Sequence, residues 1–355
     1  MSGRDTVPPH ASLLLALARP TLDPDRLLAI RALAAREDLD WGAFLHAAAR
    51  HKVLPLIGRH VDRYRLDRGP GEEKGFPHPW AFTSSYLGNR SRNQALSDEF
   101  GRLLTELTSA GVRHAVRKGF HIAETVYHDI GVRRIGDLDL LVDPAGAPEA
   151  HQVFLRLGYV RGRLAFDGER IVPALDGEES DQLPYLKAGN RPDVPEFHVD
   201  VCQGIQLKAG CTVTASELLE RSVPVHVCGT GTRAADPADR LLDLASLIHA
   251  ETIGLRSIDD RVDLQVSKFM DLALVAAQFE EADWQDLGAR VREYDVAATA
   301  YYALHFTDVL HPGVIPGGVL DLLRPRDTGY LEEYGSLDGR TARWTIPFPQ
   351  RLFVA

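Results

Sequence analysis

The chain has 355 residues, of which 45% are hydrophobic and 25% charged, and these proportions are typical of a folded globular protein. No apolar run approaches the roughly 20 residues that cross a membrane, and three cysteines without a CxxC pair give neither a disulfide framework nor a zinc signature. The net charge of −10 speaks against long nucleic acids, which basic surfaces hold. The leucine-rich start runs on into helical patterns, so we expect no signal peptide. These features predict a cytoplasmic protein that does not associate with membranes. Its expected partners are small molecules or peptides; tRNA is a less favoured partner, and DNA is not expected.

The N-terminal part of the chain predicts helices. Leu, Ile, Ala, Trp and Phe recur at i, i+3 and i+4 between residues 23 and 64, and Asp23 and either Asp38 or Asp40 are candidate N-caps. The charged Pro/Gly-rich stretch 67–80 predicts a loop.

A core of alternating helices and strands follows. Gly111 and Gly158 are placed to end the first and last of its helices. Strand–helix–strand–helix order within about fifty residues favours an α/β or α+β core. The expected elements are a helix over 83–110, a strand over 112–119, a helix over 120–128, a strand over 135–142 and a helix within 146–160.

The next segment, residues 161–196, is polar and poorly periodic, although "ERIVPAL" and "LPYLKA" could form short hairpin strands. "EFHVDVCQGI" (196–205) alternates cleanly, with His198, Asp200 and Cys202 on one face. "VPVHVCG" offers one more strand, and residues 236–310 predict helices again.

Taken together, these patterns predict an α+β protein in four segments. The core would be a small mixed sheet flanked by helical regions on both sides in sequence. The predicted segments are an N-terminal helical region (1–85), the core (86–232), a C-terminal helical region (233–312) and an irregular tail (313–355).

The stretch "RRIGDLDLLVDP" places two carboxylates at the mouth of a buried strand. Asp137 and Asp139 stand at i and i+2, so their side chains project to one face while Leu138 and Leu140 turn to the core. Such a pair alone is also typical of a solvated turn or a capping pair. With Asp200 from the polar face of the later strand, it makes the ligand set of a two-metal site for phosphoryl displacement.

Just upstream, "RKGFHIAE" predicts a strand, a turn at Lys118-Gly119 and then a helix. A glycine at such a turn lets backbone amides approach a phosphate. Lys118 and Arg133 add cations close to both motifs. The combination favours a nucleotide site.

"VRKGFHIAETVYHDIGVRRIGDLDLLVDP…FLRLGYV" resembles the uncharacterised nucleotidyltransferase family of the DNA polymerase β-like superfamily. The resemblance rests on Lys118-Gly119, Tyr127, Arg133, the run Gly136 to Val142, and "LGY" at 157–159. The flanking helical segments are similar to those of the family, so the resemblance extends to about residue 310.

The resemblance implies a polymerase β-like palm with Asp137 and Asp139 as metal ligands and Asp200 as the third carboxylate. At the third position the family often reads "vElHW", so Asp200 stands for the glutamate and Cys202 for the histidine. The turn carries Lys118 where the wider superfamily has a serine, and a lysine there could hold the β- and γ-phosphates. Gly119 and Gly136 would let phosphates approach the backbone.

Several other residues have two readings. Lys268 and Asp271 stand at i and i+3 and could form a helix-surface ion pair, or Lys268 could face nucleotide phosphate or acceptor. His249 could pack between helices or touch substrate. The cysteines read as small buried residues. Arg90 and Arg92 are either solvated or part of a basic strip with Arg113, Arg117 and Lys118.

The sequence thus predicts a nucleotidyltransferase that uses Mg²⁺, with two ions expected and Mn²⁺ as a substitute. It would move a nucleoside monophosphate from an NTP, ATP first among them, to a hydroxyl or phosphate of a small-molecule or peptide acceptor, releasing pyrophosphate. Two alternatives stay open: a toxin-like enzyme that modifies tRNA or protein, and a non-catalytic nucleotide-binding scaffold.

Overall fold

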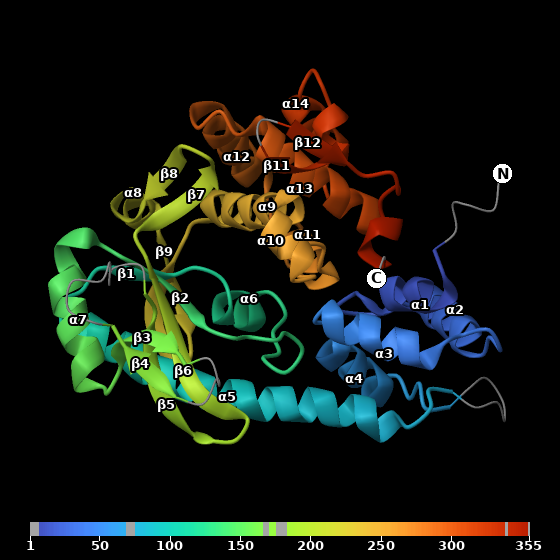
Figure 1. Cartoon of the computed structure of the whole chain (residues 1–355), viewed down its shortest axis with the longest axis horizontal. Coiled ribbons are helices and arrows are strands. Elements are labelled where there is room, and N and C mark those ends of the chain that lie inside the picture. Colours follow the sequence, from blue (N-terminus) through green and yellow to red (C-terminus); the bar gives the residue numbers. More distant parts are fainter. Residues whose placement is uncertain (1–6, 69–74, 166–169, 175–182, 338–339, 354–355) are drawn as a thin grey trace. The chain divides into compact units, whose positions relative to one another are not determined.

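The computed structural model describes residues 7–68, 75–165, 170–174, 183–337 and 340–353. The chain folds into two compact units (Figure 1). Unit 1 combines residues 1–89, 131–134 and 241–355, and unit 2 combines residues 90–130 and 135–240. The helical segments at the two ends of the chain, which the sequence treats as separate regions, therefore belong to one unit.

Unit 2 is built on a mixed sheet of eight described strands in the order β4-β3-β5-β6-β2-β1-β10-β9. Two of its neighbouring pairs, β2 with β6 and β1 with β10, are parallel, and the others are antiparallel. The strands are β1 (His114–Val116), β2 (Leu138–Val142), β3 (Val160–Leu164), β4 (Ile171–Pro173), β5 (Tyr185–Arg191), β6 (Val194–Cys202), β9 (Val223–Val227) and β10 (Thr230–Ala234).

One face of this sheet is covered by α5, the long helix drawn in cyan in Figure 1. Its buried residues Leu96, Phe100, Leu103 and Leu107 follow i, i+3, i+4 spacing and share a core cluster with residues from the sheet. The other elements of unit 2 are short. They are α6 (Phe120–Thr125), η1 (Pro144–Gly146), α7 (Ala147–Arg156), the hairpin β7 (Gly204–Lys208) with β8 (Cys211–Thr214), and α8 (Ala215–Arg221).

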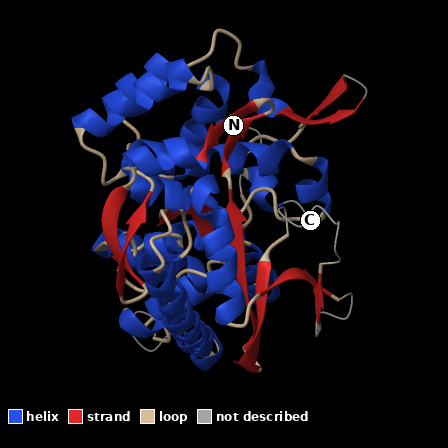
Figure 2. Ribbon diagram, turned by 90° about the vertical axis from the view of Figure 1, so that its left-hand side faces the viewer, coloured by secondary structure: helices blue, strands red, loops and turns tan. Residues whose placement is uncertain are grey.

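Unit 1 is largely helical. Figure 2 draws the helices of the chain in blue and its strands in red. Its core includes Leu13, Phe44, Phe82, Phe269 and Tyr302, all of them buried. The N-terminal helices are α1 (Pro9–Leu17), α2 (Pro24–Ala34), α3 (Trp41–Arg50), α4 (Leu54–Arg63) and the start of α5 (Pro79–Ser109). The C-terminal elements are α9 (Pro237–Ile253), α10 (Leu255–Asp259), α11 (Val266–Ala276), α12 (Glu281–Glu293), α13 (Ala297–Leu310), α14 (Gly317–Leu323), η3 (Gly329–Glu332), β11 (Glu333–Leu337), β12 (Arg340–Arg343) and η4 (Gln350–Phe353).

The structure confirms the α+β class and the mixed sheet. Asp23 and Asp40 cap α2 and α3 through their side chains, which settles the choice between Asp38 and Asp40. Gly111 and Gly158 follow α5 and α7 with φ angles of +73° and +84°, a conformation that favours glycine at a helix end. Part of the loop expected over 67–80 lies outside the described residues.

Several expectations were wrong in detail. The sheet is larger than expected, because it also includes β3 and β10, which the sequence did not predict. The two strands β4 and β5 do not pair with each other as a hairpin; β3 lies between them. The tail after residue 312 is not wholly irregular, since it holds α14 and the antiparallel pair β11–β12. Helix α5 begins at Pro79, a residue that suits a first helical turn.

Within the ranges given above, no helix is both long and apolar enough to cross a bilayer.

Candidate active site

Two of the three predicted carboxylates lie side by side in unit 2. Strand β2 pairs with β6 in parallel, and the register places Asp139 opposite Asp200. Because neighbouring strands lie about 4.8 Å apart and paired residues project to the same face, the two side chains share one face of the sheet. Leu138 and Leu140 are buried on the other face, in the core under α5.

Asp137 stands just before β2, two residues from Asp139. Its charge acts on both neighbours, since it raises the pKa of Asp139 and that of His198. The three carboxylates thus gather at the N-terminal end of β2 and the adjacent part of β6.

Asp139 is the most deeply placed of the three. It is 6% exposed, and burial is the main reason that its pKa is raised, with the opposing charge of Lys118 lowering it. Its Oδ1 lies 3.1 Å from Nζ of Lys118. Its Oδ2 is buried and has no hydrogen-bond partner among the described residues. A buried carboxylate oxygen without a partner is costly, and one purpose of keeping it is to bind a cation.

Lys118 and Gly119 form the turn between β1 and α6. Gly119 has φ +55° and ψ −112°, a backbone conformation that residues with a side chain rarely adopt. The turn therefore depends on glycine, and it directs Lys118 back towards Asp139.

Asp200 has a histidine partner on its own strand. His198 Nε2 lies 3.0 Å from Asp200 Oδ1, and this hydrogen bond lowers the pKa of the carboxyl and raises the pKa of the imidazole. The two side chains stand at i and i+2 of β6 and so project to the same face. Both are about a third exposed, at 31% and 41% of their side-chain area.

Arg117 completes the row across the sheet. Its backbone N–H donates to the carbonyl oxygen of Asp139 at 3.1 Å, which extends the pairing of β1 with β2 by one residue. Its side chain consequently lies on the same face of the sheet as the carboxylates, and its Nη1 lies 3.0 Å from Sγ of Cys202. From the sequence, Arg117 was predicted only as part of a basic strip. Its position beside Asp139 depends on the register of β1 with β2, which the sequence alone does not reveal.

The donor set fits a hard divalent cation in chemistry, because it offers carboxylate oxygens and one of them is a buried, unpartnered atom. As the side chains stand, no three His, Cys, Asp or Glu residues of the described chain are grouped closely enough to hold a metal ion. Lys118 and His198 each contact one oxygen of a carboxylate that is predicted to bind the metal, Oδ1 of Asp139 and Oδ1 of Asp200. Metal ligation by Asp137, Asp139 and Asp200 stays a prediction.

The other predicted phosphate-binding residues have different surroundings. Arg133 belongs to unit 1, where it forms a buried two-point ion pair with Asp271 at 2.8 and 3.0 Å. Lys268, also in unit 1, pairs with Glu251 and donates to the Val262 carbonyl oxygen at 2.8 Å.

The expected helix-surface pair of Lys268 with Asp271 is therefore replaced by two pairs with other partners, and Asp271 is buried. Gly136 lies in unit 2, is exposed, and has open space where a Cβ would stand. Its conformation does not itself require glycine.

The remaining residues that the sequence singled out are mostly structural. His249 packs against Tyr302 in unit 1, with ring centroids 4.8 Å apart, and burial lowers its pKa to about 4. Tyr127 is buried. All three cysteines are free; Cys228 is buried as expected, whereas Cys202 and Cys211 are half-buried.

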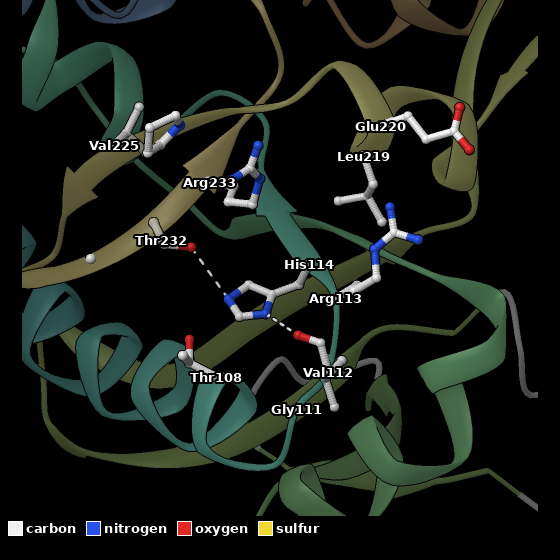
Figure 3. Close-up of a pocket in the computed structure, with 12 residues that line it drawn as sticks. Thr108, Gly111, Val112, Arg113, His114, Leu219, Glu220, Val225, Thr232 and Arg233 are labelled. Atoms are coloured by element: carbon white, nitrogen blue, oxygen red, sulfur yellow. Dashed lines mark hydrogen bonds between the residues drawn. The ribbon is translucent and has the colours of Figure 1, made fainter.

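A separate concavity of about 810 Å³ lies at the other end of β1 (Figure 3). His114 forms part of its wall, with Nδ1 2.9 Å from the Val112 carbonyl oxygen and Nε2 3.3 Å from the Thr232 hydroxyl. Since His114 and Arg117 are three residues apart along an extended chain, they face opposite sides of the sheet. Arg113, which also lines the concavity, faces the side opposite to His114, so the concavity lies at the end of the strand and is not confined to one face of the sheet.

An α+β fold with paired carboxylates beside a lysine–glycine turn defines the nucleotidyltransferase-like class. Residues 37–312 match the family described as "Uncharacterised nucleotidyltransferase", and since this is most of the chain, the protein belongs to that family. The expected family is thereby confirmed.

No curated protein matches the chain. Among solved structures, it is similar to an antigenic nucleotidyltransferase-like protein from Paracoccidioides brasiliensis, with 12% identity, 64% of this chain and 96% of that chain covered, and a TM-score of 0.32.

Proposed function

We propose that the protein is a Mg²⁺-dependent nucleotidyltransferase that moves a nucleoside monophosphate from an NTP to a hydroxyl or phosphate of a small-molecule or peptide acceptor. The observation that carries the proposal is the register of Asp139 with Asp200 on adjacent parallel strands, with Lys118 on Asp139, in a chain of this family. ATP is the first nucleotide to test.

Each side chain has a task in this reaction. Lys118 would bind phosphate oxygens of the NTP, for which its ammonium is a mobile point charge. An acceptor oxygen would attack the α-phosphorus, and the bond from that phosphorus to the bridging oxygen would break, so that pyrophosphate leaves with the bonding electrons. Asp200 has two alternative roles: it would share a metal ion that acidifies the acceptor, or it would itself accept the proton of the acceptor hydroxyl.

Asp137, Asp139 and Asp200 would hold the Mg²⁺ ions. When bound there, Mg²⁺ would neutralise phosphate charge and acidify the acceptor. The partnerless Oδ2 of Asp139 supports this assignment, because it gives the buried oxygen a function.

The proposal is tested by heating the protein with and without Mg²⁺ and each NTP. We expect Mg²⁺ with the right NTP to raise the melting temperature, since ligand at 100 times its Kd adds about 2.7 kcal/mol to the free energy of unfolding. EDTA should remove the rise. Asp139→Asn and Asp200→Asn, which keep side-chain shape, should each abolish it while remaining folded by circular dichroism.

Transfer itself is measured with NTPs labelled at the α-phosphate, incubated with a metabolite or peptide extract, followed by mass spectrometry. Label in a small molecule or peptide, together with free pyrophosphate, is the expected result. Label in tRNA or in a protein would identify the other acceptor class instead.

One observation favours a second candidate, a non-catalytic nucleotide-binding scaffold. Lys118 and His198 already contact two of the carboxylates, and the described side chains form no ready metal cluster. A scaffold would show a thermal shift with NTP that EDTA and Asp200→Asn leave intact, and no release of pyrophosphate.

A further inference from the structure

We propose that Arg117 is a further substrate-binding residue of this site and that its guanidinium contacts a phosphate of the bound NTP. The inference deepens the proposed function above and rests on it.

Arg117, the residue that follows β1, stands in line with the two paired carboxylates. Its N–H bonds the Asp139 carbonyl, and Asp139 is opposite Asp200, so the three residues form one row on one face of the sheet. Lys118, the next residue, reaches the same carboxylate from the turn. Two consecutive residues therefore bring two positive charges to one acidic cluster.

The guanidinium of Arg117 also reaches the strand that carries Asp200. Its Nη1 lies 3.0 Å from Sγ of Cys202, which stands two residues after Asp200 and so projects to the same face of β6. The guanidinium therefore lies beside the predicted reaction centre.

The contact that Arg117 makes with Cys202 is one that a phosphate can replace. Nη1 of Arg117 lies 3.0 Å from Sγ of Cys202, and a thiol sulfur is a weak hydrogen-bond acceptor. A phosphate presents charged oxygens whose spacing matches the fork of a guanidinium, and such bonds are about twice as strong as neutral ones.

The test is a calorimetric titration of MgATP into the full chain carrying Arg117→Met. Loss of a hydrogen bond to a charged group should weaken MgATP binding roughly tenfold to a hundredfold. Arg117→Lys, which keeps the charge but not the fork, should recover part of the affinity. Binding of adenosine, which has no phosphate, should be unchanged by either substitution.

Two further variants act as controls. Arg113→Met removes a guanidinium from the other end of the same strand, where it pairs with Asp143, and should leave MgATP affinity unchanged. Cys202→Ala removes the sulfur contact but keeps Arg117, and should change the affinity less than twofold.

Arg117→Met binding MgATP as tightly as the unsubstituted protein would overturn the inference and leave the proposed function standing. An equal loss in Cys202→Ala and Arg117→Met would also overturn it, because it would show that the pair acts as a structural unit. If the unsubstituted folded protein binds no NTP at all, the proposed function fails and this inference fails with it.

Discussion

Lys118 and Asp139 form the pair on which the candidate site depends most. The lysine side chain is 22% exposed and the aspartate 6%, so the carboxylate relies on this cation in place of water. Removing one partner of such a pair leaves a buried charge without compensation.

We expect Lys118→Met to lower the free energy of unfolding by about 2 kcal/mol in the absence of metal, because Asp139 loses its partner. Adding Asp139→Asn to this variant should restore part of the loss, since the remaining group is then neutral. Urea titrations at pH 7 measure both changes. Lys208→Met, at an exposed lysine of β7, is the control and should have a smaller effect. Equal stability of all the variants would contradict the pairing.

The ion pair with Asp271 indicates a structural role for Arg133, whereas the sequence predicted that Arg133 binds nucleotide phosphate. Its side chains are 17% and 4% exposed and joined at two points, as in a buried structural pair. Arg133→Met should cost about 3 kcal/mol of stability, and Arg133→Met with Asp271→Leu should recover most of it.

The exposed pair of Arg36 with Asp38 offers the comparison for this measurement. Arg36→Met should leave the urea midpoint unchanged, because exposed ion pairs contribute little. If Arg133→Met keeps full stability and instead weakens NTP binding, the nucleotide role that the sequence assigned to Arg133 would be the better one.

At the scale of elements, helix α5 carries two glycines in unlike surroundings. A Cβ on Gly101 would meet the Cys228 carbonyl oxygen at 2.2 Å, so the helix approaches the backbone of the β9–β10 turn too closely for any side chain. A Cβ on Gly88 would meet nothing within 4 Å.

Gly101→Ala should therefore destabilise the protein by about 1–3 kcal/mol, because the backbone must move to relieve the clash. Gly88→Ala should instead stabilise it by up to about 1 kcal/mol, since alanine favours the helix. Thermal unfolding of the two variants beside the unsubstituted protein tests both signs. A higher melting temperature in both variants would show that α5 does not approach the Cys228 carbonyl as closely as the structure shows.

Elements that show strong periodicity were predicted well. The alternation in "EFHVDVC" predicted β6 and its polar face, and the helical spacing from Leu96 to Leu107 matches the buried side of α5. Strand β3 was missed because "VRGRL" holds two arginines and a glycine, a composition that is typical of a loop. It exists because β4 and β5 pair with it on both sides.

At the scale of the whole molecule, buried histidines set the expected response to acid. Burial lowers the pKa of His51 to about 3 and that of His60 to about 4. The His60 ring bonds the Arg19 carbonyl oxygen through Nε2, and His51 accepts from the Val266 N–H through Nδ1. The bond to Arg19 raises the pKa of His60, but burial outweighs it, so that both rings are kept neutral. The other histidines whose pKa burial lowers to about 3 or 4 are His121, His249 and His311.

A histidine whose folded pKa lies below its unfolded value binds its proton more readily in the unfolded chain. Stability is therefore complete above the unfolded pKa of about 6.5 and is lost as the pH falls from there towards 4. The raised pKa of His198 acts in the opposite direction, but it is a single group.

We expect the urea midpoint to fall between pH 7.5 and pH 5, and to fall less in His60→Gln, which removes one of these groups. His10→Gln, at a histidine outside this set, should keep the full dependence. A midpoint that does not change over this range would mean that these rings are not held neutral in the folded protein.

The sequence by itself determined the α+β class, the family, the lysine–glycine turn and the pair of aspartates at the start of a buried strand, because each depends on residues close together in the chain. Only the tertiary structure decided which strand lies beside β2, which cation reaches Asp139, and that Arg133 and Asp271 hold each other. Those facts depend on pairing between residues far apart in sequence, where packing and strand register, rather than local pattern, select the partner.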